Sequence, residues 1–152
     1  HARSGIAMTF DHAVLHGVLG PRLDHQLASA APIALAIRDS HGELLYFIRQ
    51  PGVSLHSGVL AQNKGYTAAR DRQATRDLGN WSRESGRALP YWSDPRFTGF
   101  AGGVPLWHEG VVLGAVGVSG LSEEADHRLA SELATSLGQH LISSGDLNRG
   151  IS

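Results

Sequence analysis

A single lysine and a glycine-rich loop are the residues of this sequence whose types and spacing could support ligand chemistry. Lys64 is the only lysine in a chain whose other cationic side chains are arginines. Its amine could pair with a ligand carboxylate or act as a nucleophile, whereas most helical lysines are simply solvated. The loop from Gly99 to Pro105 could direct backbone N–H groups at an anion such as a propionate or another carboxylate. The same glycines also suit a tight turn leading into a strand.

Nine histidines are many for 152 residues, and their protonation near pH 6 would make the protein basic. His12 and His16 have the i, i+4 spacing with which a helix can hold one metal ion. They lack the His-Glu-x-x-His pattern, so a plain surface position is the competing interpretation. His56 and His108 could face a pocket between a helix and a hairpin, and His41 suits a turn.

Nucleophilic catalysis has little support in the sequence. The chain has no cysteine, which excludes disulfides, zinc–thiolate sites and cysteine nucleophiles. Ser119 and Asp126 could join a histidine in a triad on paper, but Ser119 lacks the G-x-S-x-G elbow. Asp126 is better explained as a helix-start residue favoured by the helix dipole.

Composition predicts one globular domain. The net charge of −1 gives no electrostatic reason to expect nucleic acid or an anionic membrane as a partner. No apolar run approaches the roughly 20 residues that span a bilayer, so we expect neither nucleic acid nor membrane as a partner. We expect a cytoplasmic protein, although an exported and trimmed protein would have the same composition.

The first half of the chain predicts a helix, a hairpin and a second helix. Thr9 suits the N-cap of a helix beginning at Phe10, which Pro21 should kink or divide. Alternating apolar residues predict strands over 33–39 and 44–49, joined by a turn. A helix follows from about residue 54 to 71.

The second half predicts a short helix over 78–85, a second hairpin and a last helix. Strands are expected over 104–108 and 111–118, with a tight turn between them. The last helix, over about 122–141, carries leucines at four-residue spacing that mark a core-facing stripe: Leu129, Leu133, Leu137 and Leu141. Between the short helix and the hairpin lie aromatic residues that could line a pocket: Trp81, Tyr91, Trp92, Phe97 and Phe100.

This order of elements predicts an α+β domain with an antiparallel sheet. We expect residues 1–8 to be a disordered or artificially added end. The single domain should cover 9–142, and residues 143–152 should form a flexible tail.

The glycine loop, the second hairpin and the acidic helix start together resemble a known family. GG-x-P, an apolar hairpin and G-x-x-G-V-S-G are similar to the GlcG/HbpS-type haem-binding proteins, which include the C-terminal domain of PduO-type corrinoid adenosyltransferases. The residues that carry the resemblance are Gly102, Gly103, Pro105, Gly114, Gly117, Val118, Ser119, Gly120 and Asp126. Asp39, Gly42, Arg49, Lys64 and Thr75 also fit the family pattern, while Gly65 replaces its usual alanine.

The resemblance implies a profilin-like or GAF-like antiparallel sheet of about five strands with flanking helices, assembled as a homo-oligomer. It implies an oligomeric sensor or carrier that binds haem or another tetrapyrrole between the second helix and the glycine loop. The ligand-binding residues would be Lys64, Thr67, Gly102, Gly103, Val104, Pro105, His56 and Trp107. His12 or His16 could serve as an axial or metal ligand, since haem iron needs only one imidazole.

Two other functions fit the same residues. A cofactor-independent isomerase, lyase or hydrolase could use Lys64, a histidine and the loop N–H groups on a small carboxylate-bearing metabolite. A scaffold or sensor partner with a vestigial pocket is the third possibility.

Overall fold

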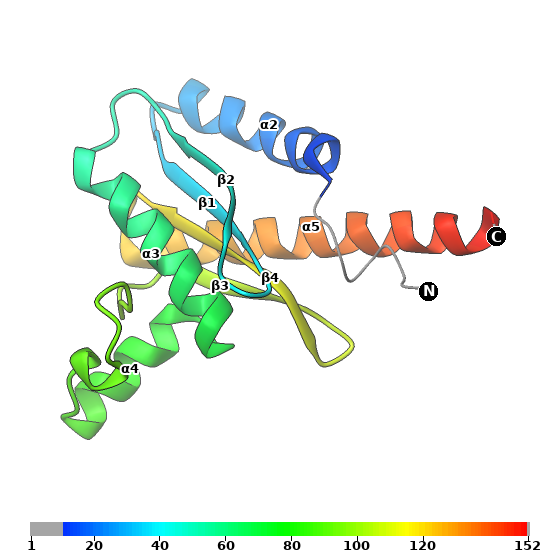
Figure 1. Cartoon of the computed structure of the whole chain (residues 1–152). Coiled ribbons are helices and arrows are strands. Elements are labelled where there is room, and N and C mark those ends of the chain that lie inside the picture. Colours follow the sequence, from blue (N-terminus) through cyan, green and yellow to red (C-terminus); the bar gives the residue numbers. More distant parts are fainter. Residues whose placement is uncertain (1–10, 152) are drawn as a thin grey trace.

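The computed structural model describes residues 11–151, and the surroundings of side chains as far as residue 140 (Figure 1). The elements in chain order are α2 (His12–Ala28), β1 (Ala34–Asp39), β2 (Leu44–Arg49), α3 (Leu55–Asp71), α4 (Thr75–Ser85), the 3-10 helix η1 (Leu89–Trp92), β3 (Gly103–His108), β4 (Val111–Ser119) and α5 (Glu123–Ile151). The predicted positions of Thr9, Phe10 and the 1–8 end lie outside the described residues.

The strands form one antiparallel sheet in the order β2-β1-β4-β3. Both predicted hairpins are confirmed, and β1 and β4 are its central strands. The expectation of about five strands is wrong for the described part of the chain, which has four. The alternating patterns themselves indicate two hairpins; the fifth strand came only from the family resemblance, and helices occupy the segments between the hairpins.

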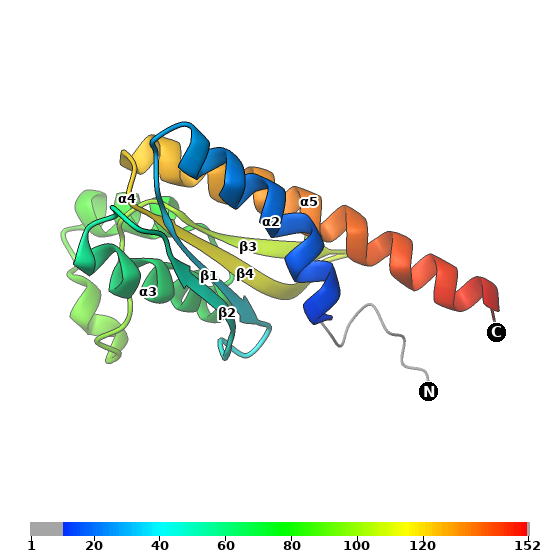
Figure 2. The ribbon, with the colours of Figure 1, turned by 90° about the horizontal axis from the view of Figure 1, so that it is seen from above.

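Helices cover both faces of the sheet, with α2 and α5 on one face and α3 on the other, where α4 lies beside it (Figure 2). The main core lies between the sheet and the α2–α5 layer. Leu129, Leu133 and Leu137 are buried there, which confirms the predicted stripe. No described helix is long and apolar enough to cross a membrane.

Two helix boundaries differ from expectation. Asp11 caps α2 by accepting a hydrogen bond from the Ala13 N–H at 2.7 Å, and Pro21 lies inside α2 without dividing it. Burial of Leu15, Leu19 and Leu23 explains this, because each contributes about 1.5–3 kcal/mol against a proline cost of about 3 kcal/mol. Helix α5 continues to Ile151 instead of ending near residue 141, and its last turns extend beyond the sheet (Figures 1 and 2).

Helix α3 packs directly onto the backbone of β4. A Cβ placed on Gly117 would collide with the Ala61 carbonyl oxygen and lie 2.6 Å from the Gly65 nitrogen. Gly65, on α3, is less crowded: its Cβ would lie 3.2 Å from Cγ of Arg38 and 3.4 Å from the Gly117 nitrogen. Gly65, which replaces the family's alanine, therefore packs closely against its neighbours but leaves enough space for a methyl group after a small shift.

These two glycines should respond differently to the same substitution. Gly117→Ala should lower the free energy of unfolding by about 1–3 kcal/mol or more, because the new methyl group forces α3 away from the sheet. Gly65→Ala should be nearly neutral, because a gain of about 1 kcal/mol in helix propensity offsets mild crowding against the flexible Arg38 side chain. Urea denaturation of both variants tests this, and equal destabilisation would contradict the close backbone contact.

Candidate functional site

Lys64 forms a buried ion pair instead of lining an open pocket. Only 2% of the residue is exposed. Its Nζ atom donates to Oδ2 of Asp126 at 3.1 Å and to the Val118 carbonyl at 2.9 Å. The other Asp126 oxygen accepts the Leu121 N–H at 3.0 Å. The lysine thus joins α3 to the end of β4 and the first turn of α5.

Burial sets the electrostatics of this pair. Desolvation lowers the pKa of Lys64, although the Asp126 carboxylate opposes this shift. Desolvation likewise raises the pKa of Asp126, against the attraction of Lys64 and the hydrogen bond from Leu121. Each charge therefore depends on the other, and in this arrangement the ammonium group has no side open to a ligand. A ligand-binding role for Lys64 stays a prediction.

Sequence reasoning singled out Lys64 and Asp126 separately but missed that they are partners. They lie 62 residues apart, and a helix-start aspartate has a sufficient local explanation. The available signal was that both residues match the same family pattern.

Removing one partner should be costly. Lys64→Ala should lower the free energy of unfolding by about 3–5 kcal/mol, because it leaves a buried carboxylate without its counter-charge. The double variant Lys64→Met with Asp126→Asn should recover a large part of this loss, and the exposed control Arg49→Ala should lose little. Chemical denaturation measures all three. A Lys64→Ala protein as stable as the parent would contradict a structural role.

The backbone of the glycine loop is already hydrogen-bonded. The Gly103 N–H donates to Oγ1 of Thr75 at 2.8 Å, and the Ala101 N–H donates to Glu123 at 2.9 Å. A Cβ on Gly102 would lie 2.9 Å from Nζ of Lys64, and one on Gly103 would collide with the Lys64 carbonyl. These contacts agree with a tight turn leading into β3, and they account for the family-pattern threonine. The predicted ligand contacts of Gly102 and Gly103 are not tested by them.

The remaining predicted residues are scattered over the fold. Pro105 is buried in β3 and Val104 is half-buried, while Trp107 is 52% exposed. His12 and His16 are exposed on α2 with stacked rings, their centroids 5.9 Å apart. Among the described residues, no group of three or more histidine, aspartate or glutamate side chains is placed to hold a metal ion.

Thr67 anchors the aromatic segment to α3. Its hydroxyl donates to the Asn63 carbonyl at 2.8 Å and accepts the Thr98 N–H at 3.1 Å. It is fully buried, so its position beside the glycine loop is a structural contact in this arrangement.

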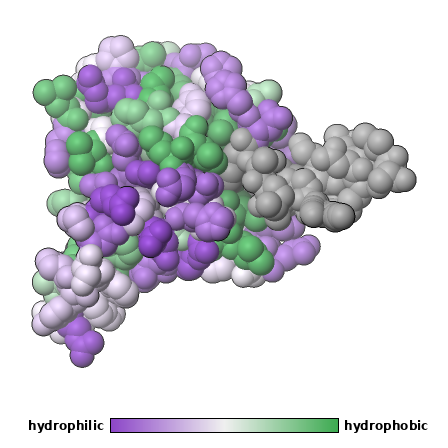
Figure 3. All heavy atoms as spheres, in the orientation of Figure 1, coloured by the Kyte–Doolittle hydropathy of each residue, from purple (hydrophilic) through white to green (hydrophobic). Residues whose placement is uncertain are grey.

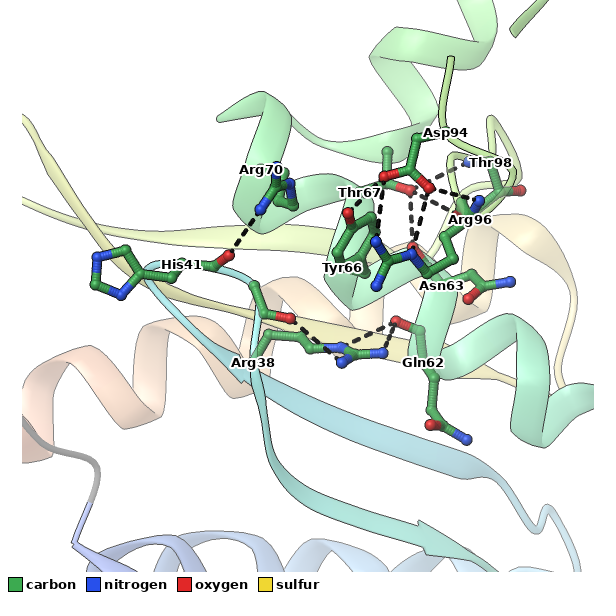
Figure 4. A network of polar contacts seen from close by, with 11 residues as sticks. Arg38, His41, Gln62, Asn63, Tyr66, Thr67, Arg70, Asp94, Arg96 and Thr98 are labelled. Atoms are coloured by element: carbon green, nitrogen blue, oxygen red, sulfur yellow. Dashed lines mark hydrogen bonds and ion pairs between the residues drawn. The ribbon is translucent and has the colours of Figure 1, made fainter. Parts of the chain in front are cut away.

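Beside Thr67, a polar cluster surrounds Tyr66 (Figure 4). The phenol donates a hydrogen bond to Asp94. Three guanidinium groups lie around its ring: Arg96 at 3.8 Å from the centroid, Arg70 at 5.4 Å and Arg38 at 5.6 Å. This hydrogen bond lowers the pKa of Asp94, and burial followed by the same bond raises the pKa of Tyr66. Sequence reasoning missed the cluster, because Tyr66 and Asp94 lie 28 residues apart and no spacing rule connects their segments.

The Tyr66–Asp94 bond should make stability depend on pH in a defined way. An aspartate with a lowered folded-state pKa stabilises the protein above its unfolded pKa of about 3.9, and loses that contribution as pH falls through the folded value. Tyr66→Phe should therefore be less stable than the parent at pH 7 by about 1.5 kcal/mol, and the gap should narrow below about pH 4. Urea titrations at several pH values measure this; a gap that stays constant with pH would contradict it.

An exposed apolar surface lies where α3 begins beside the edge strand β2. Leu55 is 80% exposed, Val59 47% and Phe47 39%. Gly58 leaves room for the strand side chains, since its Cβ would lie 3.3 Å from both the Phe47 ring and the Arg49 stem. Green spheres gather over β2 and the start of α3 in Figure 3. We call this region the α3–β2 surface: Phe47, Arg49, Leu55 and Val59.

The α3–β2 surface consists of residues that sequence reasoning did not group, and one residue of the predicted site, His56, lies next to it on the first turn of α3. The signal was present, since Leu55 and Val59 have i, i+4 spacing and Phe47 and Arg49 share one face of a strand. Arg49 makes no hydrogen bond or ion pair through its guanidinium group with any described residue, and His56 is exposed beside Leu55 in α3. A cation without a partner and apolar side chains are thus available on one surface, and an exposed imidazole lies next to it on the first turn of α3.

Fold and sequence place the chain among small α+β proteins with a four-stranded antiparallel sheet. The family model described as "Haem degrading protein HbpS-like" matches residues 20–135. The chain therefore belongs to the HbpS-like family, which confirms the resemblance seen in the glycine loop and the second hairpin.

Individual relatives agree with this assignment. Corrinoid adenosyltransferase PduO of Salmonella typhimurium is 34% identical over 131 residues, covering 76% of this chain. The chain spans only 38% of that relative's length. The crystal structure of a PduOC:heme complex is similar with a TM-score of 0.76 and 26% identity, covering 85% of this chain and 95% of that one. A double mutant of Streptomyces reticuli HbpS shares the fold, with a TM-score of 0.69, 21% identity, and coverage of 93% and 94%.

Proposed function

We propose that this protein binds haem or a closely related tetrapyrrole. The observation that carries the proposal is the likeness to the PduOC:heme complex over 85% of the chain, at 26% identity and a TM-score of 0.76. Membership of the HbpS-like family supports the same ligand class. The activity of the longer PduO relatives is not part of the proposal, since the chain covers little more than a third of their length.

The α3–β2 surface has the chemistry that haem requires. The macrocycle needs apolar contact, which Phe47, Leu55 and Val59 offer to solvent. The iron needs one imidazole, which His56, exposed next to this surface on the first turn of α3, would supply. A propionate needs a cation without a partner, and the guanidinium of Arg49 is suited to bind a carboxylate in a bidentate manner.

The space between α3 and the glycine loop, where the ligand was predicted from the sequence, is a less suitable place. Lys64 and Thr67 are buried and hydrogen-bonded there, and Gly103 lies against the α3 backbone. These residues and Gly102 could contact a ligand directly only if α3 and the loop separated. Without that separation, Lys64 would act on the ligand indirectly, by positioning α3.

The proposal includes assembly into a homo-oligomer that senses or carries the ligand. A haem on the α3–β2 surface would have one open face, and Leu55 at 80% exposure is an apolar group that a second copy could cover. The enzymatic alternative has less support, because the amine that it needs, Lys64, is already bonded to Asp126 and Val118.

A haemin titration tests the proposal. The purified protein should give a saturable, stoichiometric Soret shift, which His56→Ala should abolish and Arg49→Gln should weaken about tenfold, by the loss of one charged hydrogen-bonding group. Size-exclusion chromatography of the same samples reports whether the protein is oligomeric and whether haemin changes its size.

The matched controls are His12→Ala and His16→Ala, which remove exposed imidazoles from α2. Both should bind haemin like the parent. Loss of the Soret shift in either control but not in His56→Ala would move the axial ligand to α2. An unsaturable shift in the parent would contradict specific haem binding altogether.

A further inference from the structure

A second candidate site lies between the end of α4 and η1, in the part of the fold that projects from the sheet at the lower left of Figure 1. It is a cleft of about 460 Å³ lined by Trp81, Arg87, Tyr91 and Trp92. None of these residues belongs to the α3–β2 surface or to the predicted haem site. The cleft therefore needs an explanation of its own.

The backbone around Arg87 is held firmly. Gly86 ends α4 with a φ of +74° and donates its N–H to the Ser82 carbonyl at 3.1 Å. The Arg87 carbonyl accepts the Ser82 hydroxyl at 2.8 Å, and its N–H donates to the Ser85 hydroxyl at 3.2 Å. This reversal brings η1 back alongside α4 and places the arginine between the aromatic residues of both elements.

The walls of the cleft are aromatic rings with exposed faces. Trp81 and Trp92 lie with centroids 5.9 Å apart at an interplanar angle of 52°. Phe97 braces Trp92 at 5.7 Å, so the tryptophan is supported although 40% exposed. Tyr91 is 74% exposed. Large rings that are supported but not covered are suited to stack on a flat apolar ligand.

The charge of the cleft is not neutralised. Among the arginines whose side chains are described, Arg49 and Arg87 are the two whose guanidinium groups make neither hydrogen bonds nor ion pairs with described residues. Arg76 forms an ion pair with Asp77, and the others donate hydrogen bonds to carbonyl groups, to carboxylates or to an amide oxygen. Arg87 can therefore offer a bidentate contact to a carboxylate.

We propose that this cleft binds a planar aromatic carboxylate of two or three fused rings, independently of the haem surface. The ring system would stack on one of the two indoles, Trp81 or Trp92, and meet the other at its edge, and the carboxylate would pair with Arg87. The volume is within the range of small-molecule sites, about 300–1,000 Å³. Both the flat ring and the negative charge are needed, since the site combines stacking surfaces with one unpaired cation.

The test uses 2-naphthoate as the probe and the 152-residue protein, followed by NMR of the tryptophan indole N–H groups. The chain has three tryptophans, so Trp107, on β3, is an internal control. Saturable shifts are expected for Trp81 and Trp92 with no shift for Trp107. Naphthalene-2-carboxamide, which has the same rings without the charge, should bind at least about tenfold more weakly, by the loss of a charge-assisted contact.

Variants complete the test. Arg87→Gln should weaken 2-naphthoate at least about tenfold and leave the carboxamide unchanged. Arg83→Gln, a control in the last turn of α4 whose side chain bonds to Asn80, should bind like the parent. Tyr91→Ala should weaken both compounds without unfolding, because its side chain is exposed.

Binding to His56→Ala should equal binding to the parent, which separates this proposal from the haem proposal. Unchanged 2-naphthoate affinity in Arg87→Gln would overturn the assignment. So would shifts confined to Trp107, or no saturable shift of Trp81 and Trp92 at millimolar probe.

Discussion

The buried ion pair between Lys64 and Asp126 is the interaction on which the arrangement of the fold depends. It joins the middle of α3 to the carbonyl at the end of β4 and to the first turn of α5. A buried pair is weak support for stability in itself, because desolvation opposes the attraction. Its value here is geometric, since the Lys64 ammonium group ties α3, β4 and α5 together at one point. The glycine loop follows from it, because Gly102 passes so close to the ammonium group that a side chain would not fit.

Local patterns predicted most of the fold. The alternation over 33–39 and 44–49, the second hairpin and the leucine stripe of the last helix all correspond to observed elements, because each is a periodic signal within one segment. The predicted number of strands was wrong, because the fifth strand was taken from the family resemblance and not from an alternating sequence pattern. The prediction that Pro21 divides the first helix was wrong. It considered the local cost of proline in a helix but not the burial of the leucines around it.

The site was harder to predict, because its interactions join distant segments. The Lys64–Asp126 pair spans 62 residues and the Tyr66–Asp94 bond 28, and no spacing rule connects such partners. The exposed residues of the α3–β2 surface also look ordinary one at a time. Only the packing of β2 against Gly58 shows that Phe47 and Arg49 share a surface with the start of α3. The aromatic segment was recognised as pocket-forming, but the unpaired state of Arg87 is visible only in three dimensions.

The contact between α3 and β4 has a mechanical consequence. At Gly117 the strand meets the Ala61 carbonyl and the Gly65 nitrogen directly, and the buried clusters on either side consist of alanines, which have no rotamers to change. Close-packed interiors transmit displacement instead of absorbing it. Helix α3 and the sheet are therefore expected to move as one rigid unit, which Lys64 connects to α5. A displacement of the exposed first turn of α3 is passed to α5 on the opposite face, a helix whose far end extends beyond the sheet (Figure 2).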